Sequence, residues 1–429
     1  MKQIKTSDND FKERFNELLK RGHMDMDNVS KIVLNIISEI KKDGNEALKA
    51  HIEKFDKWTP QKDEDLQIAT SDMKKAYDNL DEDLKNALQL AYKRIKTYHE
   101  KQKPNSWLDF EDNGTVLGQK VTAVDKAGLY IPGGKAAYPS SLLMNAIPAI
   151  VAGVKEIVVC TPAPNDELNS LLLAAMHLCG IKKAYKVGGA SAIASMAYGT
   201  QTIAKVDVIT GPGNIFVATA KKLVFGEVNI DMIAGPSEIG VLADESADTN
   251  FLAIDLLSQA EHDQMASSIL VTPSQSIADE TSKKVYEWLE KLERKEIAMT
   301  SIKERGAIIV TKDMDEALEL MNQIAPEHLE VMTEQPFELL PRIKHAGAIF
   351  MGRYTPEPIG DYIAGPNHTL PTGGTAKFYS PLGVENFLKK SSIISLSQEG
   401  IKEIGHECAL LAQTEGLGAH RASVLERLK

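Results

Sequence analysis

An alternation of short apolar runs with helical stretches, beginning near residue 121, is the feature that most constrains the fold of this chain. Four of these runs predict buried strands, at residues 127–132, 157–161, 184–187 and 206–210. Helices are expected to open near Ser140, Asn165, Ser191 and Asn214, with Gly153 and Gly180 as C-terminal stops. This order predicts a doubly wound parallel sheet, because parallel strands need crossover helices that cover both faces.

The same rhythm resumes after residue 232 and predicts a second α/β unit. Its strands are expected at residues 232–242, 268–272, 307–311 and 348–351. Its helices are expected at residues 251–262, then up to residue 292, then up to residue 324. The segment from Gly352 to Tyr379 is rich in Gly, Pro and Thr, which predicts a loop of the kind that carries ligands.

The two ends of the chain have a different texture. The first hundred residues are highly charged and helical in pattern, with apolar stripes that include Phe11 and Phe15, then Val29 and Ile36. They predict arms and a scaffold. The last fifty residues predict a short strand at residues 393–396 followed by helices. This segment is too small for a core of its own, so it must pack on something else.

Charge and cysteine content limit the classes of function. Lys and Arg number 49 and Asp and Glu number 60, a net charge of −11 that disfavours nucleic acid or a membrane surface and favours a small-molecule substrate. Cys160, Cys179 and Cys408 form no C-x-x-C pair, which indicates a reducing compartment and argues against disulfides or an all-thiolate zinc site. Without an apolar leader or membrane-length stretch, a soluble cytoplasmic protein is expected.

Three glycine-rich turns follow predicted strands, where backbone N–H groups and helix N-termini can hold a phosphate. They are residues 131–135 (IPGGK), 187–191 (VGGAS) and 210–214 (TGPGN). None is the dinucleotide fingerprint, because the third turn has Phe216 where its last glycine should fall. A nicotinamide cofactor is compatible with these turns, and so are tight turns that bind nothing.

Several oxygen and nitrogen donors suggest a metal site. Gln259 and His262 are three residues apart at a predicted helix end and therefore share a face. Asp361 and His368 add a carboxylate and an imidazole in the loop, and His420 lies near the C-terminus. Such donors without thiolates suit zinc, manganese or cobalt. Each residue taken separately is also consistent with a satisfied structural side chain.

An adjacent carboxylate and imidazole, Glu327 and His328, follow Pro326, which interrupts the preceding helix. The pair can divide two proton-transfer tasks if both side chains enter one pocket, and a solvent-facing helix-to-strand connection is the alternative. No H-E-x-x-H motif is present, and Cys160 is expected to be a packing residue. Three further histidines in charged helical sequence are expected to be solvated: His23, His51 and His99.

Taken in order, these segments resemble the histidinol dehydrogenase family over essentially the whole chain. The motifs that carry the resemblance are residues 128–134 (GLYIPGG), 234–238 (AGPSE), 258–263 (SQAEHD), 326–330 (PEHLE), 360–368 (GDYIAGPNH), 415–417 (EGL) and His420. The resemblance implies an NAD-dependent zinc enzyme that oxidises L-histidinol through an aldehyde to L-histidine. Two NAD+ would be reduced, in the last step of histidine biosynthesis.

The resemblance also implies an architecture. It predicts a homodimer. Each subunit would have two incomplete Rossmann-like doubly wound parallel-sheet domains, together with small N- and C-terminal helical or extended segments. An incomplete domain accounts for Phe216 at the position of the last fingerprint glycine. The expected limits are a helical arm (1–25), a first α/β domain with the metal and catalytic residues (26–126 and 238–380), an NAD-binding α/β domain (127–237) and a C-terminal dimerisation tail (381–429).

Carried over residue by residue, the resemblance implies the following roles. The ligands of one zinc ion per subunit would be Gln259, His262, Asp361 and His420. The catalytic acid/base pair would be Glu327 and His328. Substrate would contact Ser237, Glu415, His328 and the zinc ligands, and NAD would contact Tyr130, Ser191 and Asn214.

Position 191 departs from the family, which usually has glutamine where this chain has serine. Serine keeps a hydroxyl donor and acceptor but is shorter, which predicts either a water-bridged contact or a lower NAD affinity. At the tail, the apolar stripe that includes Ile404 and Leu411 predicts that His420 and Glu415 reach the partner subunit's site. The loop at residues 369–377 is a candidate for closing over the site.

The roles assigned to Glu327 and His328 predict a mechanism, and other functions remain as alternatives. Neutral His328 would take the alcohol proton and Glu327 would activate the water that hydrates the aldehyde, with faster turnover at alkaline pH. A relative that oxidises a sulfonated diol is one alternative, although Glu415 would repel a sulfonate. A zinc hydrolase that needs no nicotinamide is another. A silent scaffold is disfavoured, because the residues for metal, substrate and proton transfer are all present.

Overall fold

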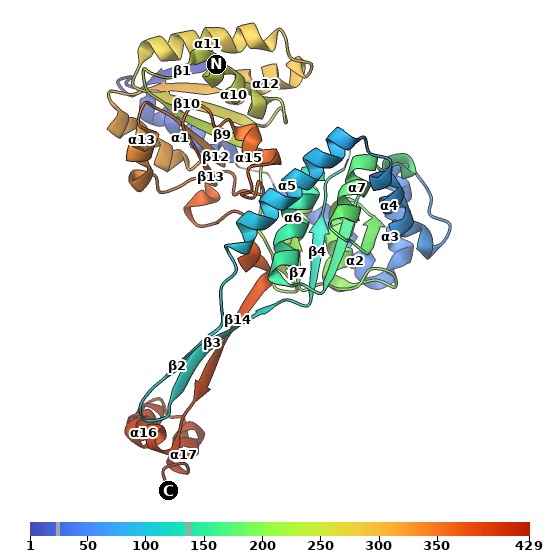
Figure 1. Ribbon diagram of the computed structural model, residues 1–429, viewed down its shortest axis with the longest axis vertical. Helices are drawn as coiled ribbons and strands as arrows, with labels where there is room; N and C mark the ends of the chain where they lie inside the picture. The colour runs from blue at the N-terminus through green and yellow to red at the C-terminus, as the bar shows by residue number, and fades with distance from the viewer. Residues whose placement is uncertain (23–25, 134–138) are drawn as a thin grey trace.

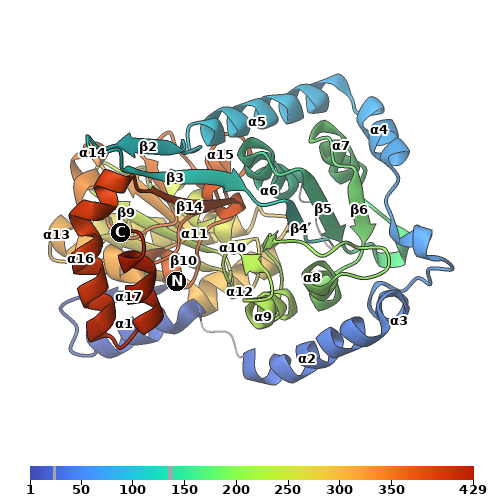
Figure 2. The same cartoon turned by 90° about the horizontal axis from the view of Figure 1, so that it is seen from below.

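The computed structural model describes residues 1–22, 26–133 and 139–429 and is a mixed α/β structure, as the sequence predicts. A six-stranded and a five-stranded parallel sheet form two units that lie side by side (Figures 1 and 2). An antiparallel arm projects from them to the C-terminal helices, so the C-terminus lies at the tip of the arm and the N-terminus on the six-stranded unit (Figure 1).

The five-stranded unit has helices on both faces of its sheet. Its strands are β4 (Lys126–Tyr130), β5 (Glu156–Thr161), β6 (Lys183–Lys186), β7 (Val208–Thr210) and β8 (Asn229–Ile230). Its helices are α2 (Met26–Asp43), α3 (Asn45–Asp56), α4 (Thr70–Asp78), α5 (Glu82–Glu100), α6 (Pro139–Ala152), α7 (Ser170–Leu178), α8 (Gly189–Tyr198) and α9 (Ile215–Val224). The strand order β6-β5-β4-β7-β8 is that of a dinucleotide-binding fold without its sixth strand.

Helices α2 to α5 pack on this sheet, which corrects the expected grouping of residues 26–126 with the other unit. Ile40 shares a buried cluster with Tyr130 on one face, and Ile95 shares another with Leu129 on the opposite face. An apolar stripe predicts that a helix packs, but it does not identify the sheet that covers it.

The six-stranded unit repeats the same topology. Its strands are β1 (Lys2–Lys5), β9 (Glu238–Ala243), β10 (Ser267–Thr272), β11 (Ala307–Val310), β12 (His328–Met332) and β13 (Ala348–Met351). Its helices are α1 (Phe11–Leu19), α10 (Thr249–Ala260), α11 (Gln275–Leu289), α12 (Lys295–Arg305), α13 (Met314–Ile324), α14 (Pro336–Leu339) and α15 (Glu357–Tyr362). The order is β1-β11-β10-β9-β12-β13, so the expected N-terminal helical arm instead begins with an edge strand of this sheet.

The arm joins two distant parts of the chain. It consists of β2 (Trp107–Phe110), β3 (Val116–Ala123) and β14 (Leu388–Ser395), followed by α16 (Gln398–Thr414) and α17 (Gly418–Leu425). Large apolar side chains along it are exposed, among them Phe110, Ile394, Leu410 and Leu411. Apolar surface of this extent on one subunit is typical of a protein interface.

Two histidines that were expected to be solvated are buried. His99 has no exposed surface and its Nδ1 donates to the Ile95 carbonyl at 2.8 Å, while His51 lies under α2 and beside α8. Cys160 is fully buried, and burial raises the pKa of its thiol, in agreement with a packing role. Three residues named from the sequence, His23, Gly134 and Lys135, lie outside the described residues. Across the described ranges, no helix combines the length and apolarity needed to cross a membrane.

Candidate active site

The acid/base pair expected from the sequence lies at the amino end of β12, the strand next to the edge strand β13. Helix α13 ends at Ile324, Ala325 adopts a left-handed conformation with φ 48°, and Pro326 follows, so the chain turns sharply into β12. His328 is the first residue of β12 and pairs with Ile239 of β9. Rossmann-like sheets usually bind ligands at the carboxyl ends of their strands. This pair instead lies at the amino ends of the strands.

Backbone atoms of Glu238 hold both members of the pair. The Glu238 N–H donates to Glu327 Oε2 at 2.8 Å, and His328 Nδ1 lies 3.0 Å from the Glu238 carbonyl oxygen. Because a carbonyl oxygen can only accept, Nδ1 carries a hydrogen, and in the neutral ring Nε2 is bare. Both side chains are buried. His328 Nε2 is therefore the atom available to accept a proton.

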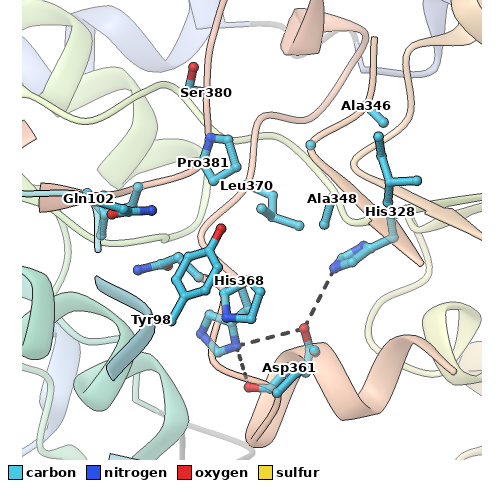
Figure 3. Close-up of a pocket in the computed structure, with 18 of the residues that line it drawn as sticks. Tyr98, Gln102, His328, Ala346, Ala348, Asp361, His368, Leu370, Ser380 and Pro381 are labelled. Carbon is cyan, nitrogen blue, oxygen red and sulfur yellow. Dashed lines mark hydrogen bonds and ion pairs between the residues drawn. The ribbon is translucent and has the colours of Figure 1, made fainter. Parts of the chain in front are cut away.

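Two carboxylates of α15 face His328 Nε2. Asp361 Oδ1 lies 3.6 Å from this nitrogen and Glu357 Oε1 lies 3.8 Å from it. Ligand atoms of His328, Glu357 and Asp361 all lie within 4.8 Å of one another, close enough to surround one cation. His368 Nδ1 donates to the Asp361 backbone carbonyl at 2.9 Å. Figure 3 shows His328, Asp361 and His368 converging on one pocket.

Burial and neighbouring charges shift the pKa values of these groups. Burial raises the pKa of Glu327 to about 8 and that of Glu357 to about 8. Burial acts to lower the pKa of His328, but the carboxylates of Glu327, Asp361 and Glu357 outweigh it and raise that pKa to about 10. Burial also disfavours ionised Asp361, yet the His328 and His368 rings hold its pKa well below the usual range. A cation bound among these carboxyl groups would favour their ionised forms.

Unpartnered buried atoms provide an independent test of whether the residues fit a metal ion. Within the ranges that the structure describes, Gln259 Oε1, His328 Nε2 and Glu357 Oε1 are buried and lack a hydrogen-bond partner. A buried polar atom without a partner costs free energy, which a ligand can recover. The donors are all nitrogen or oxygen, as in many zinc sites. The residues present therefore fit a divalent ion.

Two of the expected ligands lie next to this cluster. Gln259 is in the last turn of α10, where the hydroxyl of its neighbour Ser258 lies 3.1 Å from Glu357 Oε2. His262 follows the helix end. Desolvation lowers the pKa of the His262 imidazole, and the charge of Asp361 acts on the ring in the opposite sense.

The other residues expected to contact substrate or zinc lie in two places, the six-stranded unit and the arm. Ser237 directly precedes β9, and its carbonyl accepts the Ser267 N–H at 3.0 Å. Glu415 caps the C-terminal end of α16 and His420 lies in α17, so both are at the tip of the arm, away from β12 (Figure 1). Of the expected metal ligands, Asp361 lies in the cluster with His328 and Glu357, and Gln259 and His262 lie at the end of α10, the helix whose Ser258 contacts Glu357.

A cavity of about 960 Å³ opens beside His328 between the two units. Tyr98 in α5 and Gln102 just beyond it line the opposite wall (Figure 3). His368 Nε2 lies 3.4 Å from the Ser141 hydroxyl in α6, so the two units also meet at this histidine. A substrate in the cavity would have one wall from each sheet.

A buried ion pair supports the acid/base pair from the N-terminal segment. Arg21 Nη2 donates to Glu238 Oε2 at 3.0 Å and to the Ile324 carbonyl at 2.7 Å, while Glu238 Oε1 accepts the Gly373 N–H at 2.9 Å. The proposed closing loop is thus attached to Glu238. Sequence reasoning assigned no role to Arg21, Glu238 or Glu357. Only Glu238 carried a signal, its place in the AGPSE motif.

Replacing Arg21 with methionine is expected to lower the free energy of unfolding by about 3–5 kcal/mol, because it leaves the Glu238 carboxylate buried and unpaired. Urea unfolding measures the change. The control is Arg14→Met, which removes partly exposed pairs with Asp8 at 3.7 Å and Asp10 at 3.9 Å and a hydrogen bond to the Gln3 carbonyl at 2.9 Å, and should cost about 1–2 kcal/mol. Equal losses in the two variants would show that the Arg21 pair has no special weight.

All three residues expected to contact NAD line a second cavity of about 590 Å³, in the five-stranded unit. Tyr130 ends β4, and its hydroxyl accepts the Gly189 N–H at 3.2 Å; burial raises its pKa to about 12. Ser191 lies in the first turn of α8. Asn214 caps α9 by accepting the Phe216 N–H at 3.1 Å, so its amide hydrogens are left for a ligand. This cavity lies at the carboxyl ends of the strands, as expected for a dinucleotide.

Comparison with known proteins identifies the family of this chain. The family model described as histidinol dehydrogenase matches residues 19–428. The chain belongs to the histidinol dehydrogenase family. Histidinol dehydrogenase of Sulfurimonas denitrificans is 70% identical over 418 residues, covering 97% of both chains. That of Wolinella succinogenes is 68% identical over 428 residues, covering 100% of this chain and 99% of the other.

A solved histidinol dehydrogenase has the same fold. The crystal structure of the protein from Elizabethkingia anophelis superposes with a TM-score of 0.94 at 35% identity, covering 100% of this chain and 98% of the other. The family resemblance inferred from the motifs is confirmed. Membership of the histidinol dehydrogenase family makes the chain an oxidoreductase of histidine biosynthesis that acts on a small molecule.

Proposed function

We propose that the protein oxidises L-histidinol through histidinal to L-histidine, with bound zinc and the reduction of two NAD+, as a cytoplasmic homodimer. The observation that carries the proposal is the placement of His328: its Nδ1 is held by the Glu238 carbonyl, and its Nε2 lacks a hydrogen-bond partner among the described residues and faces the Asp361 carboxylate at 3.6 Å. This is the arrangement that an alcohol dehydrogenase needs for a general base beside a metal ligand. Family membership supports the same activity.

Zinc would be held by Gln259, His262 and Asp361 together with His420 of the partner subunit. A bound zinc ion would hold the substrate through the nitrogen atoms of the substrate, and NAD+ would accept the hydride. Ser237 and the partner's Glu415 are the remaining substrate contacts that we propose. Positioning by several fixed groups favours reaction, because it removes the entropic cost of alignment.

The proton transfers follow from the hydrogen bonds around His328 and Glu327. His328 Nε2 takes the hydroxyl proton as the first C–H bond breaks, and the Nδ1 hydrogen bond to Glu238 keeps the ring oriented. Glu327 then removes a proton from the water that adds to the aldehyde carbon. His328, after losing its first proton, takes a proton from the resulting gem-diol as the second C–H bond breaks.

The dimer is supported by the arm. Glu415 caps α16 and His420 lies in α17, the two helices at the tip of the arm, and the apolar side chains along the arm have no cover from the rest of the described chain. In a pair of subunits, each arm can bury this surface and deliver these two residues to the partner's cavity.

The ratio kcat/KM for L-histidinol is expected to rise as the pH increases from about 6 to about 10, because only neutral His328 can accept a proton. The surrounding carboxylates raise the pKa of His328 to about 10. A cation bound to Asp361 would oppose that rise, so kcat/KM should increase between about pH 6 and about pH 10. Steady-state rates in buffers of constant ionic strength measure it. A steady fall above neutral pH would contradict the role of His328.

Substrate choice separates this proposal from its alternatives. NADH absorbance would be followed with zinc-loaded protein and either L-histidinol or a sulfonated diol such as 2,3-dihydroxypropanesulfonate. If NAD+ is reduced with L-histidinol and not with the sulfonated diol, the proposal is supported. Reduction with only the sulfonated diol would favour a different alcohol substrate, and failure of the protein to bind NAD+ would favour a hydrolase.

A further inference from the structure

The cavity that contains Tyr130, Ser191 and Asn214 has an apolar wall suited to a flat ring. Ile32 and Ile36 of α2 and Ile52 and Phe55 of α3 line it, and Ile32 and Phe55 are exposed in spite of their size. The residues that line it differ from those that line the catalytic cavity. It therefore suits the half of a dinucleotide that takes no part in the chemistry, the adenosine half.

A buried carboxylate, Asp56, lines the same cavity. Asp56 is the last residue of α3, and its Oδ2 accepts the Ala163 N–H at 3.4 Å, just beyond the end of β5. Dinucleotide-binding folds generally place an acidic residue after the second strand, where it binds the adenosine ribose. Here β5 is the second strand of the unit, and residues 162–164 that follow it are Pro-Ala-Pro. Asp56 supplies the missing acid from a different element.

Hydrogen bonds from Glu39 through His51 determine whether the Ser191 hydroxyl donates or accepts a hydrogen. His51 Nε2 lies 2.7 Å from Glu39 Oε2, and His51 Nδ1 lies 2.9 Å from Ser191 Oγ. The Glu39 carboxylate can only accept, so in the neutral ring Nε2 carries the hydrogen and Nδ1 is bare. Ser191 must then donate its hydrogen to His51, which leaves its oxygen lone pairs for a ligand. The cavity thus presents acceptors, which suit ribose hydroxyl groups.

We propose that Asp56, aided by Ser191, selects a dinucleotide whose adenosine ribose carries free hydroxyl groups, and so determines the preference for NAD+ over NADP+. The inference rests on the proposed use of a nicotinamide cofactor and names the residue that chooses it. A 2′-phosphate would place negative charge against Asp56 and bring no hydroxyl donor to it. Lys54 also lines the cavity, with its Nζ 5.2 Å from the centre of the Phe55 ring, and its positive charge favours both dinucleotides because both carry a pyrophosphate.

Titration calorimetry of the full-length protein with NAD+ and with NADP+ tests the proposal. The wild-type protein should bind NAD+ at least about tenfold more tightly. Asp56→Asn should bring the two affinities together, chiefly by tightening NADP+ binding. Ser191→Ala should weaken both by a similar factor, because it removes an acceptor and no charge. The matched control is Glu53→Gln, an exposed change of the same charge in α3, which should alter neither.

The outcomes separate this proposal from the function on which it rests. Binding of NAD+ with an unchanged NAD+/NADP+ ratio in Asp56→Asn would overturn the role of Asp56 and leave the cofactor proposal intact. A wild-type protein that binds neither dinucleotide would overturn both. If Asp56→Asn does not fold, 5′-AMP and adenosine 2′,5′-bisphosphate can be compared on the wild-type protein. Tighter binding of 5′-AMP supports the proposal, and equal binding overturns it.

Discussion

Replacement of His328 by asparagine is expected to lower kcat by roughly 10²- to 10⁴-fold, the usual contribution of a general base. The asparagine amide can still donate to the Glu238 carbonyl, which His328 Nδ1 contacts at 3.0 Å, so the strand should keep its geometry. The variant lacks the Nε2 atom that faces Asp361. Steady-state kinetics with L-histidinol and NAD+ measure the loss, and KM should change far less than kcat.

A matched control for this variant is His177→Asn, the same substitution at a residue that contacts Tyr77 in the five-stranded unit, outside both cavities. It should keep the wild-type kcat. If His328→Asn retained kcat within about tenfold of the wild type while the control behaved as expected, His328 would not be the proton acceptor.

Hybrid dimers are expected to regain activity from two inactive chains. A Glu327→Gln chain and a His420→Ala chain should each be inactive alone, because every site in either homodimer lacks one essential group. In a hybrid, one site combines an intact Glu327 with an intact His420 from the other subunit. An equal mixture that exchanges freely should reach about one quarter of wild-type activity, since half of the dimers are hybrids with one working site.

The matched control pairs two variants that lie in the same site of one chain. Asp361 and His328 are 3.6 Å apart, and Glu327 is adjacent to His328, so Glu327→Gln and Asp361→Asn chains cannot restore one another. This mixture should stay inactive. If the Glu327→Gln and His420→Ala mixture also stayed inactive after subunit exchange had been demonstrated, the arm would not complete the partner's site.

The parallel sheets could be predicted because their strands are buried on both faces. β5, expected at residues 157–161, spans Glu156–Thr161, and β10, expected at residues 268–272, spans Ser267–Thr272. The arm could not be predicted in the same way. β2 is exposed throughout and β3 is mostly half-buried, so neither forms the continuous apolar run that indicates a buried strand.

The same distinction applies to the candidate site. Glu327, His328 and Asp361 stand in local motifs with characteristic neighbours, and the structure places them together. Arg21 has no such signal, because its partner Glu238 is 217 residues away in the sequence. The burial of His51 has no local signal either, because a charged helical pattern does not reveal a contact with Ser191, 140 residues further along.

The central claim is a four-electron oxidation carried out by one site, and product stoichiometry tests it most directly. Zinc-loaded protein would be incubated with NAD+ and limiting L-histidinol, NADH would be followed by absorbance, and L-histidine would be quantified at the end point. We expect two NADH and one L-histidine for each L-histidinol consumed. One NADH with accumulated histidinal would contradict the proposed hydration step at Glu327, and no NADH would contradict the assigned substrate.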